Sequence, residues 1–305
     1  MTSPLRIGTR GSPLALWQAN YVAGRLRPLA APRPVELVLI ETSGDVVRDL
    51  PLSQIGGDGV FTKEIQRALL ADAVDVAVHS LKDLPTTPVA GLTLGAVPER
   101  GPAGDVFVSR RHARFDDLPH RAVVATSSLR RRAQALHRRP DLKLTTIRGN
   151  VETRLRKLDE QGFDAIILAQ AGLERLGLAT HITELLDPSW MFPAVGQGAL
   201  GLECRADDAA VLDLLGPLND GPTRQAVLAE RALLRGLGGG CLVPIGARAV
   251  VEADRLTLRA AVLAPDGSRR VVDEAEGPAS EAESIGKALA ERMLVHGARE
   301  LLAMR

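Results

Sequence analysis

The sequence has few aromatic residues, few cysteines and no long hydrophobic run. Only 3% of its 305 residues are aromatic, so its core must be built mainly from aliphatic side chains. Two cysteines make no disulfide framework, which favours a reducing compartment, and we expect a cytoplasmic protein. No segment reaches the ~20 apolar residues of a membrane span, and residues 1–18 lack the apolar run of a signal peptide, so we expect no membrane partner.

Net charge is also small, at +1, but the positive charge is concentrated in one stretch. Between Arg110 and Lys157 there are 14 Lys and Arg against 4 Asp and Glu, so this stretch carries +10 and the rest of the chain −9. Such segregation indicates an anionic ligand, although a solvated basic face is the alternative. The stretch holds one aromatic residue, Phe115, so it offers no stacking platform for single-stranded nucleic acid.

Strand and helix patterns alternate along the first two thirds of the chain, which predicts parallel α/β layers. Strands are expected at 5–8, 35–41, 74–80, 122–125, 142–147, 164–169 and 200–205, and helices from residue 13 and at 61–73, 127–139, 151–161 and 171–177. Stretches rich in Pro and Gly interrupt the pattern at 96–105, 186–198 and 216–222. After the last of these, a helix at 223–237, three strands with a turn at Asp266-Gly267, and a long helix at 280–304 predict a small α+β domain with an antiparallel sheet.

Polar clusters follow four of the predicted strands. Ligands of open α/β sheets bind beyond the carboxyl ends of the strands, so these clusters are candidate binding residues. They comprise Thr9, Arg10 and Ser12; His79, Ser80, Lys82 and Asp83; Thr126, Ser127, Ser128, Arg130 and Arg131; and Thr145, Thr146, Arg148, Asn150 and Arg154.

The stretch TSSLRRR is the most specific anion-binding feature. Its hydroxyls can cap a helix N-terminus, where free backbone N–H groups and the helix dipole favour negative charge. Arg130 and Arg131 oppose that dipole, so they need a compensating anion. Guanidinium groups suit forked contacts with carboxylates or phosphates, and a solvated, capped helix is the alternative reading.

Two titratable residues near the third predicted strand call for different interpretations. Asp83 is a lone carboxylate among cations: either it forms a salt bridge with Lys82 or an arginine, or it stabilises a cationic intermediate and moves protons. His79 follows an apolar strand and fits a hydrogen-bonded core histidine better than a base. The stretch GQGALG at 196–201 matches a dinucleotide fingerprint, but a strand rather than a helix follows it, which argues against nucleotide binding.

The two cysteines have different surroundings. Cys241 follows three glycines, which are costly to order unless the backbone must go where side chains would clash or something bulky lies beside the sulfur. Cys204 lies in the predicted strand at 200–205 and reads as a packed thiol.

Seven motifs in order along the chain resemble the porphobilinogen deaminases, also called hydroxymethylbilane synthases. They are RIGTRGSPLALWQA, DVAVHSLKDLP, TSSLRRRAQ, RPDLK with IRGNVETRL, DAIILAQAGLERLGL, PAVGQGALGLECR and GGGCLVPIG. The resemblance implies a transferase of tetrapyrrole and haem biosynthesis that condenses four porphobilinogen molecules head to tail into hydroxymethylbilane, with release of ammonia. It also implies a dipyrromethane cofactor joined by a thioether to the position of Cys241.

The resemblance also implies roles for individual residues. Asp83 would be catalytic, holding pyrrole N–H groups and stabilising the positive charge of the substrate after ammonia is lost. Residues at positions that bind the cofactor or the acidic groups of the substrate are Arg10, Ser12, Asp45, Lys82, Thr126, Ser127, Ser128, Arg130, Arg131, Arg148, Arg154 and Arg175. No metal is implied. Where many relatives carry lysines, this chain has Gln54 and Asp58, so no contact is inferred there.

The fold implied by the resemblance is α/β with three domains. The first two would resemble the lobes of two-domain solute-binding proteins: residues 1–98 with 193–215 form the first, and residues 99–192 the second, with arginines from both facing one cleft. Residues 216–305 form the third, which carries Cys241. We expect a monomer acting on a small molecule. A pure anion-binding module and a nucleic-acid binder are the rival functions, and the glycines before Cys241 and the lack of aromatics argue against them.

Overall fold

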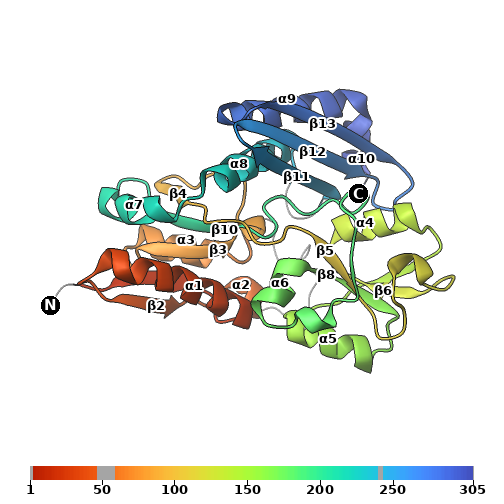
Figure 1. The fold of residues 1–305 in the computed structure, drawn as a ribbon, viewed down its shortest axis with the longest axis horizontal. Helices are drawn as coiled ribbons and strands as arrows, with labels where there is room; N and C mark the ends of the chain where they lie inside the picture. The colour runs from red at the N-terminus through yellow and green to blue at the C-terminus, as the bar shows by residue number, and fades with distance from the viewer. Residues whose placement is uncertain (1–2, 47–58, 240–242, 305) are drawn as a thin grey trace. The chain divides into compact units, whose positions relative to one another are not determined.

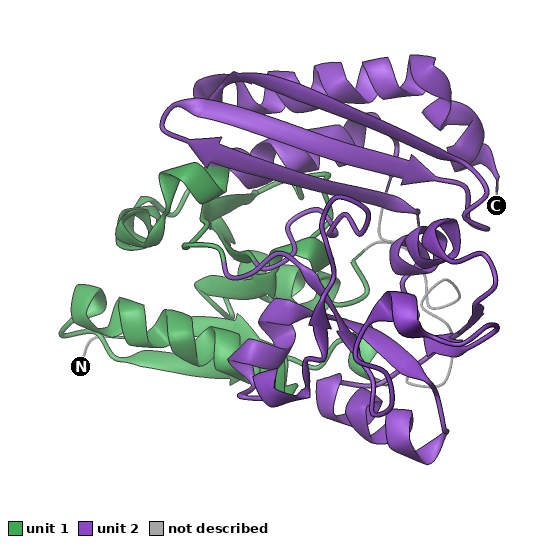
Figure 2. Cartoon of the chain, turned by 45° about the vertical axis from the view of Figure 1, so that its right-hand side comes forward, with its two compact units in different colours: residues 1–100, 199–224 green, residues 101–198, 225–305 purple. Residues whose placement is uncertain are grey.

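The computed structural model describes residues 3–46, 59–239 and 243–304 (Figure 1). The chain forms two compact units, one of residues 1–100 with 199–224 and the other of residues 101–198 with 225–305 (Figure 2). In the first unit the chain therefore returns after a long excursion. The predicted boundaries of three domains stay a prediction, since this division places 101–198 and 225–305 in one unit.

The first unit contains a mixed five-stranded sheet in the order β2-β1-β3-β10-β4. Its strands are β1 (Leu5–Thr9), β2 (Val35–Leu39), β3 (Val76–Ser80), β4 (Leu92–Ala96) and β10 (Leu200–Arg205). β1 pairs in parallel with β2 and β3, whereas β10 runs antiparallel to β3 and β4. The expected parallel arrangement holds for β1, β2 and β3 but not for β10, because the returning segment enters the sheet in the opposite direction.

Helices cover both faces of this sheet. They are α1 (Pro13–Ala30), α2 (Ser43–Val46), α3 (Lys63–Leu70) and α7 (Ala209–Leu215), with 3-10 turns η2 (Leu81–Asp83) and η5 (Gly216–Leu218). Alternate residues of a strand point to opposite faces. Val76 and Val78 of β3 accordingly pack with α1 and α7, while Ala77 between them packs with α3. His79 and Ser80 continue this alternation at the end of β3.

The second unit contains another mixed five-stranded sheet, in the order β7-β6-β8-β5-β9. Its strands are β5 (Asp105–Val108), β6 (Val123–Ala125), β7 (Lys143–Thr145), β8 (Ala165–Ala169) and β9 (Glu184–Leu185). Its helices and 3-10 turns are η3 (Phe115–Asp117), α4 (Leu129–Arg138), α5 (Val151–Glu160), α6 (Gln170–Arg175) and η4 (Ala179–His181). β6 is parallel to β7 and β8, and β5 is antiparallel to β8.

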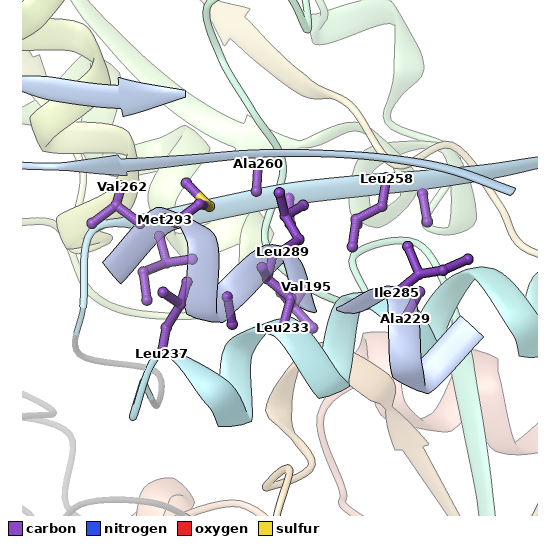
Figure 3. Close-up of a cluster of buried hydrophobic side chains, with 14 of the residues drawn as sticks. Val195, Ala229, Leu233, Leu237, Leu258, Ala260, Val262, Ile285, Leu289 and Met293 are labelled. Atoms are coloured by element: carbon purple, nitrogen blue, oxygen red, sulfur yellow. The ribbon is translucent and has the colours of Figure 1, made fainter. Parts of the chain in front are cut away.

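The C-terminal part of the second unit is the small antiparallel domain that the sequence predicts. It contains the sheet β11-β12-β13, with strands β11 (Ile245–Glu252), β12 (Arg255–Leu263) and β13 (Arg270–Pro278). Its helices are α8 (Gly221–Gly236), whose first residues belong to the first unit, then η6 (Ala279–Glu281), α9 (Ala282–Met293), η7 (Leu294–Ala298) and α10 (Arg299–Ala303). Figure 3 shows Leu233 of α8, Leu289 of α9, and Leu258 and Val262 of β12 in one cluster of buried side chains. This aliphatic core agrees with the scarcity of aromatic residues.

Several predicted elements differ from those observed. The helix expected at 280–304 is broken at Gly297, whose φ of 101° is non-helical, so α9 and α10 are separate. The turn at Asp266-Gly267 is confirmed, with Gly267 at φ 76°. As expected, a turn followed by strand β10, rather than a helix, comes after Gly196. Strands β4, β5 and β9 and helix α7 were not predicted.

Candidate active site

Three strands of the first unit end at the same edge of their sheet. β1, β2 and β3 run parallel, so the residues that follow Thr9, Leu39 and Ser80 lie at one edge. This edge carries the predicted site residues Arg10, Ser12, Asp45, Lys82 and Asp83. The sheet topology thus brings together the predicted residues of this unit.

Arg10 and Asp45 form a bidentate ion pair. Arg10 donates through Nε and Nη2 to the two carboxylate oxygens of Asp45, at 3.0 and 2.5 Å. Its guanidinium also lies 4.1 Å from the centre of the Phe61 ring. Burial raises the pKa of Asp45, but hydrogen bonds from Arg10 and Thr42 outweigh it and hold that pKa below its usual value. Both side chains remain about one-fifth exposed, so the guanidinium is held in place and still reachable.

Ser12 and His79 have structural roles in the first unit. Ser12 is the N-cap of α1, accepting a hydrogen bond from the backbone N–H of Ala15, and Pro13 follows at the first helical position. His79 is buried, and its Nε2 lies 3.2 Å from a carboxylate oxygen of Glu203 on β10. The interpretation of His79 as a hydrogen-bonded core residue is therefore confirmed.

Asp83 has no cationic partner among the residues that the structure describes. It ends the short turn η2 directly after β3 and is half-buried. Among the residues that the structure describes, none forms a hydrogen bond or ion pair with its carboxylate. The alternative of a salt bridge to Lys82 or an arginine is thus absent from this part of the chain.

The second unit presents a corresponding edge. β6, β7 and β8 are parallel, so Thr126–Ser128, Arg148 and Arg175 follow their carboxyl ends on one side of the sheet. Ser128 caps α4 by accepting from the N–H of Arg131, and Ser127 Oγ bonds with both the carbonyl and the N–H of Ile147. The side chain of Thr126 is buried and accepts from the N–H of Ser128. These hydroxyls shape the loop at the start of α4.

Arg130 and Arg131 have an internal anion, Asp105, which the sequence did not indicate. Asp105 begins β5, whose antiparallel direction places it beside the end of β8. It accepts from Arg130 Nη1 at 2.5 Å, from Arg131 Nε and Nη2 at 3.0 and 2.7 Å, and from Gln197 at 2.9 Å. Burial raises the pKa of Asp105, but the two guanidinium groups hold it well below its usual range. The anion that the sequence predicts as a partner of Arg130 and Arg131 is therefore Asp105, a residue of the protein itself.

The remaining arginines of this edge are anchored in different ways. Arg154 Nε donates to the carbonyl of Gly149, and Arg175 Nη2 donates to that of Gly198. Arg148 differs, because its Nη1 is buried without a hydrogen-bond partner among the residues that the structure describes. A buried N–H donor that lacks an acceptor costs about 1–3 kcal/mol, so an acceptor from a ligand is favoured there.

Of the two cysteines, Cys204 lies among the residues that the structure describes. Cys204 lies on β10 with no exposed surface, and burial raises the pKa of its thiol to about 11. The interpretation of Cys204 as a packed thiol is confirmed. Cys241 lies outside the described residues, as do Gln54 and Asp58.

Neither a metal centre nor a transmembrane helix occurs in the described ranges. Within residues 3–46, 59–239 and 243–304, no group of three or more His, Cys, Asp or Glu side chains could hold a metal ion. In the same ranges, no helix has the length and apolar character needed to cross a bilayer.

Comparison with known proteins identifies the family. The model of the porphobilinogen deaminase dipyrromethane cofactor binding domain matches residues 5–213, and that of the porphobilinogen deaminase C-terminal domain matches residues 224–295. Porphobilinogen deaminases from Geobacter metallireducens and Pelobacter propionicus are 52% and 51% identical to this chain. Each alignment covers 98% of this chain, with 94% and 96% of the respective relative.

Solved structures of solute-binding proteins also align with the chain. A periplasmic substrate-binding protein of an ABC transporter from Coxiella burnetii aligns with a TM-score of 0.44 at 14% identity, covering 74% of this chain and 94% of that one. The sequence relatives and the family models are the stronger finding, because they extend over nearly the whole chain. The chain belongs to the porphobilinogen deaminase family, and it is a transferase of tetrapyrrole biosynthesis that uses a dipyrromethane cofactor to condense four porphobilinogen molecules into hydroxymethylbilane with release of ammonia.

Proposed function

We propose that Asp83 is the catalytic carboxylate of this condensation and that Cys241 carries the dipyrromethane through a thioether. When bound, the dipyrromethane supplies the free pyrrole α-carbon to which substrate is added. The observation that carries the proposal is the carboxylate of Asp83, which has no hydrogen-bond or ion-pair partner in the described part of the chain. For Cys241, the support is its place after three glycines and the packed, unreactive character of Cys204.

The chemistry of the substrate explains why an uncompensated carboxylate is useful. Loss of ammonia from the aminomethyl group of porphobilinogen leaves an electrophile that is cationic when protonated. A fixed negative charge in a half-buried position stabilises that cation more than it stabilises the neutral substrate, which lowers the barrier. The same oxygens can accept hydrogen bonds from pyrrole N–H groups and thereby orient the ring.

The residues at both strand edges fit a ligand with many carboxylates. Each porphobilinogen unit carries an acetate and a propionate group, and guanidinium groups bind carboxylates through forked contacts. In the first unit, Arg10 is oriented by Asp45, and Ser12 and Lys82 lie at the same edge. In the second unit, Nη1 of Arg148 is a buried donor without an acceptor among the described residues, so a carboxylate of the ligand would satisfy it.

The other predicted residues divide into ligand contacts and residues that orient them. We propose that Arg154 and Arg175, each tied to a backbone carbonyl, bind acidic side chains of the growing pyrrole chain. Thr126, Ser127 and Ser128 would present N–H and hydroxyl donors at the start of α4. The buried Arg130 and Arg131 would add positive electrostatic potential at the start of α4. The negative charge of Asp105 opposes it.

The setting of the enzyme is also a proposal. We infer that it acts as a monomer in the cytoplasm, on porphobilinogen alone and without a nucleic-acid partner. Support comes from the two cysteines of the sequence, one of them a buried thiol, and from the single aromatic residue in the basic stretch.

Replacing Asp83 with Asn tests the catalytic role. The amide keeps the shape of the side chain but removes its charge, so the cofactor should remain attached while each condensation slows about 100-fold or more. Porphobilinogen consumption and pyrrole content of the purified variant are the measurements, and Asp213→Asn, which changes an exposed carboxylate of the same unit, is the control. Near-normal turnover of Asp83→Asn would remove Asp83 from the mechanism.

A further inference from the structure

A buried polar cluster joins β3, the strand before Asp83, to β10 and α3, and none of the roles assigned above uses it. Glu203, His79 and Gln66 are 5%, 4% and 6% exposed. Gln66 Nε2 donates to both carboxylate oxygens of Glu203, at 3.0 and 3.2 Å, and His79 Nε2 lies 3.2 Å from one of them. His79 and Gln66 thus converge on the same carboxyl group. Burying such groups costs free energy, so a cluster of this kind calls for a function.

The strand register explains how His79 reaches Glu203. In the antiparallel pair of β3 and β10, Gly201 lies opposite His79, and Glu203 follows two residues further along on the same face. The missing side chain of Gly201 also makes room for Leu81, since a Cβ there would come within 2.8 Å of Leu81 Cδ1. Leu81 is the first residue of the turn that ends at Asp83.

Ser80 and Leu81, which lie between His79 and Asp83, are also anchored by hydrogen bonds. Ser80 points to the other face of the sheet, where Gln18 of α1 donates to its Oγ at 2.8 Å and accepts from it at 3.2 Å. The N–H of Leu81 donates to the carbonyl of Ala199 at 3.0 Å, and its side chain is buried. Residues 79, 80 and 81 are therefore held from both faces of the sheet and from the neighbouring strand, while the carboxylate of Asp83 is not held by any described residue.

We propose that Glu203 is a positioning residue for the condensation, which acts through His79 to fix the end of β3 and the turn that carries Asp83. The inference rests on the role proposed above for Asp83. An ion pair would also hold Asp83, but it would neutralise the charge that the cationic substrate needs. Positioning through the backbone keeps the carboxylate in place and leaves its charge available, because preorganised groups stabilise a developing charge best.

Glu203→Gln, measured in the cofactor-loaded enzyme, tests the proposal. The amide keeps the side-chain volume, but it has one oxygen where the carboxyl group has two, so it cannot keep all three contacts with Gln66 and His79. We expect kcat to fall about tenfold, with KM for porphobilinogen within about twofold and pyrrole content unchanged, because a small misplacement of a reacting group costs rate rather than binding.

Asp75→Asn is the matched control. Asp75 directly precedes β3 at its other end, is 3% exposed, and accepts from Arg6, Arg33 and Arg205. The same acid-to-amide change there should lower the melting temperature while leaving kcat within about twofold, since no residue of the proposed site depends on it. An equal loss of kcat in the two variants would show that Glu203 acts through stability alone and would overturn the proposal.

A double-mutant comparison separates this inference from the proposed function. If Glu203 acts through Asp83, Glu203→Gln should cost no further rate in an Asp83→Asn background. A full additional tenfold loss there, or normal kcat in Glu203→Gln alone, would overturn the positioning role. Normal turnover of Asp83→Asn would instead refute the role of Asp83 itself.

Should Glu203→Gln fail to fold, Gln66→Met is the alternative variant, because it removes two hydrogen bonds and no charge. It should lower kcat in the same way, and an unchanged kcat would count against the proposal.

Discussion

Replacing Asp105 with Asn should destabilise the second unit strongly. The carboxylate is fully buried and accepts four hydrogen bonds, three from the guanidinium groups of Arg130 and Arg131 and one from Gln197. Removing one partner of a buried ion pair leaves the other charge uncompensated, which costs about 3–5 kcal/mol. Here two cations lose their partner, so the loss should lie toward the upper end of that range.

Denaturant unfolding followed by tryptophan fluorescence measures this loss. Of the two tryptophans, Trp190 packs on the core of the second unit, so Trp17→Phe provides a background that reports on that unit. Asp116→Asn is the matched control, because Asp116 pairs with Arg138 with both side chains about half exposed. It should cost at most about 1 kcal/mol. A loss for Asp105→Asn no larger than that of the control would refute the reasoning.

The same residue predicts a dependence on pH. The pKa of Asp105 is lower in the folded protein than its unfolded value of about 3.9, so its contribution is complete above that pH. As the pH falls below about 4 toward the folded pKa, the unfolded chain takes up the proton first and the contribution is lost. The stability difference between wild type and Asp105→Asn should therefore be constant from pH 5 to 7, in the range of about 3–5 kcal/mol, and shrink at pH 3. A stability difference of the same size at pH 3 would contradict a lowered pKa of Asp105 in the folded protein.

Three further predictions follow from the fold and the site. Cys241→Ser should fold without cofactor and with almost no activity, whereas Cys204→Ser should keep both; equal loss in the two would contradict the proposed attachment. Cys204, with its thiol pKa of about 11, should react with iodoacetamide at pH 8 only after unfolding, as peptide mapping would show, and rapid labelling of the native protein would disprove its burial. Gly267→Ala should destabilise the protein by about 1–3 kcal/mol, because φ is 76° and a Cβ would lie 2.6 Å from the backbone nitrogen of His137; an unchanged unfolding midpoint would refute this.

The local elements of the fold follow from the sequence where patterns are strong. Helix α1 from residue 13, helix α4 after Ser128 and the turn at Gly267 were predicted because each depends on neighbouring residues. Strand β5 was missed because its first residue, Asp105, ends a stretch rich in Pro and Gly that reads as a loop. The antiparallel direction of β10 depends on long-range pairing, about which periodicity carries no information.

The residues of the candidate site could be proposed from the sequence, but their contacts could not. The polar residues that follow parallel strands lie at one edge of each sheet, since strand direction fixes where such residues gather. The pairing of Arg10 with Asp45, 35 positions away, and of Arg131 with Asp105, 26 away, arises only when the sheets form. Glu203 was likewise missed, because its partner His79 lies 124 positions earlier. Its only signal in the sequence is a charged residue inside the apolar run LGLEC.

Intact-mass analysis with peptide mapping is the most direct test of the central claim. Protein purified from a host that makes haem should be heavier than the bare chain by one dipyrromethane, the added mass should map to the peptide containing Cys241, and the protein should consume porphobilinogen. An unmodified chain that nevertheless condenses porphobilinogen, or a dipyrromethane found on Cys204, would contradict the account.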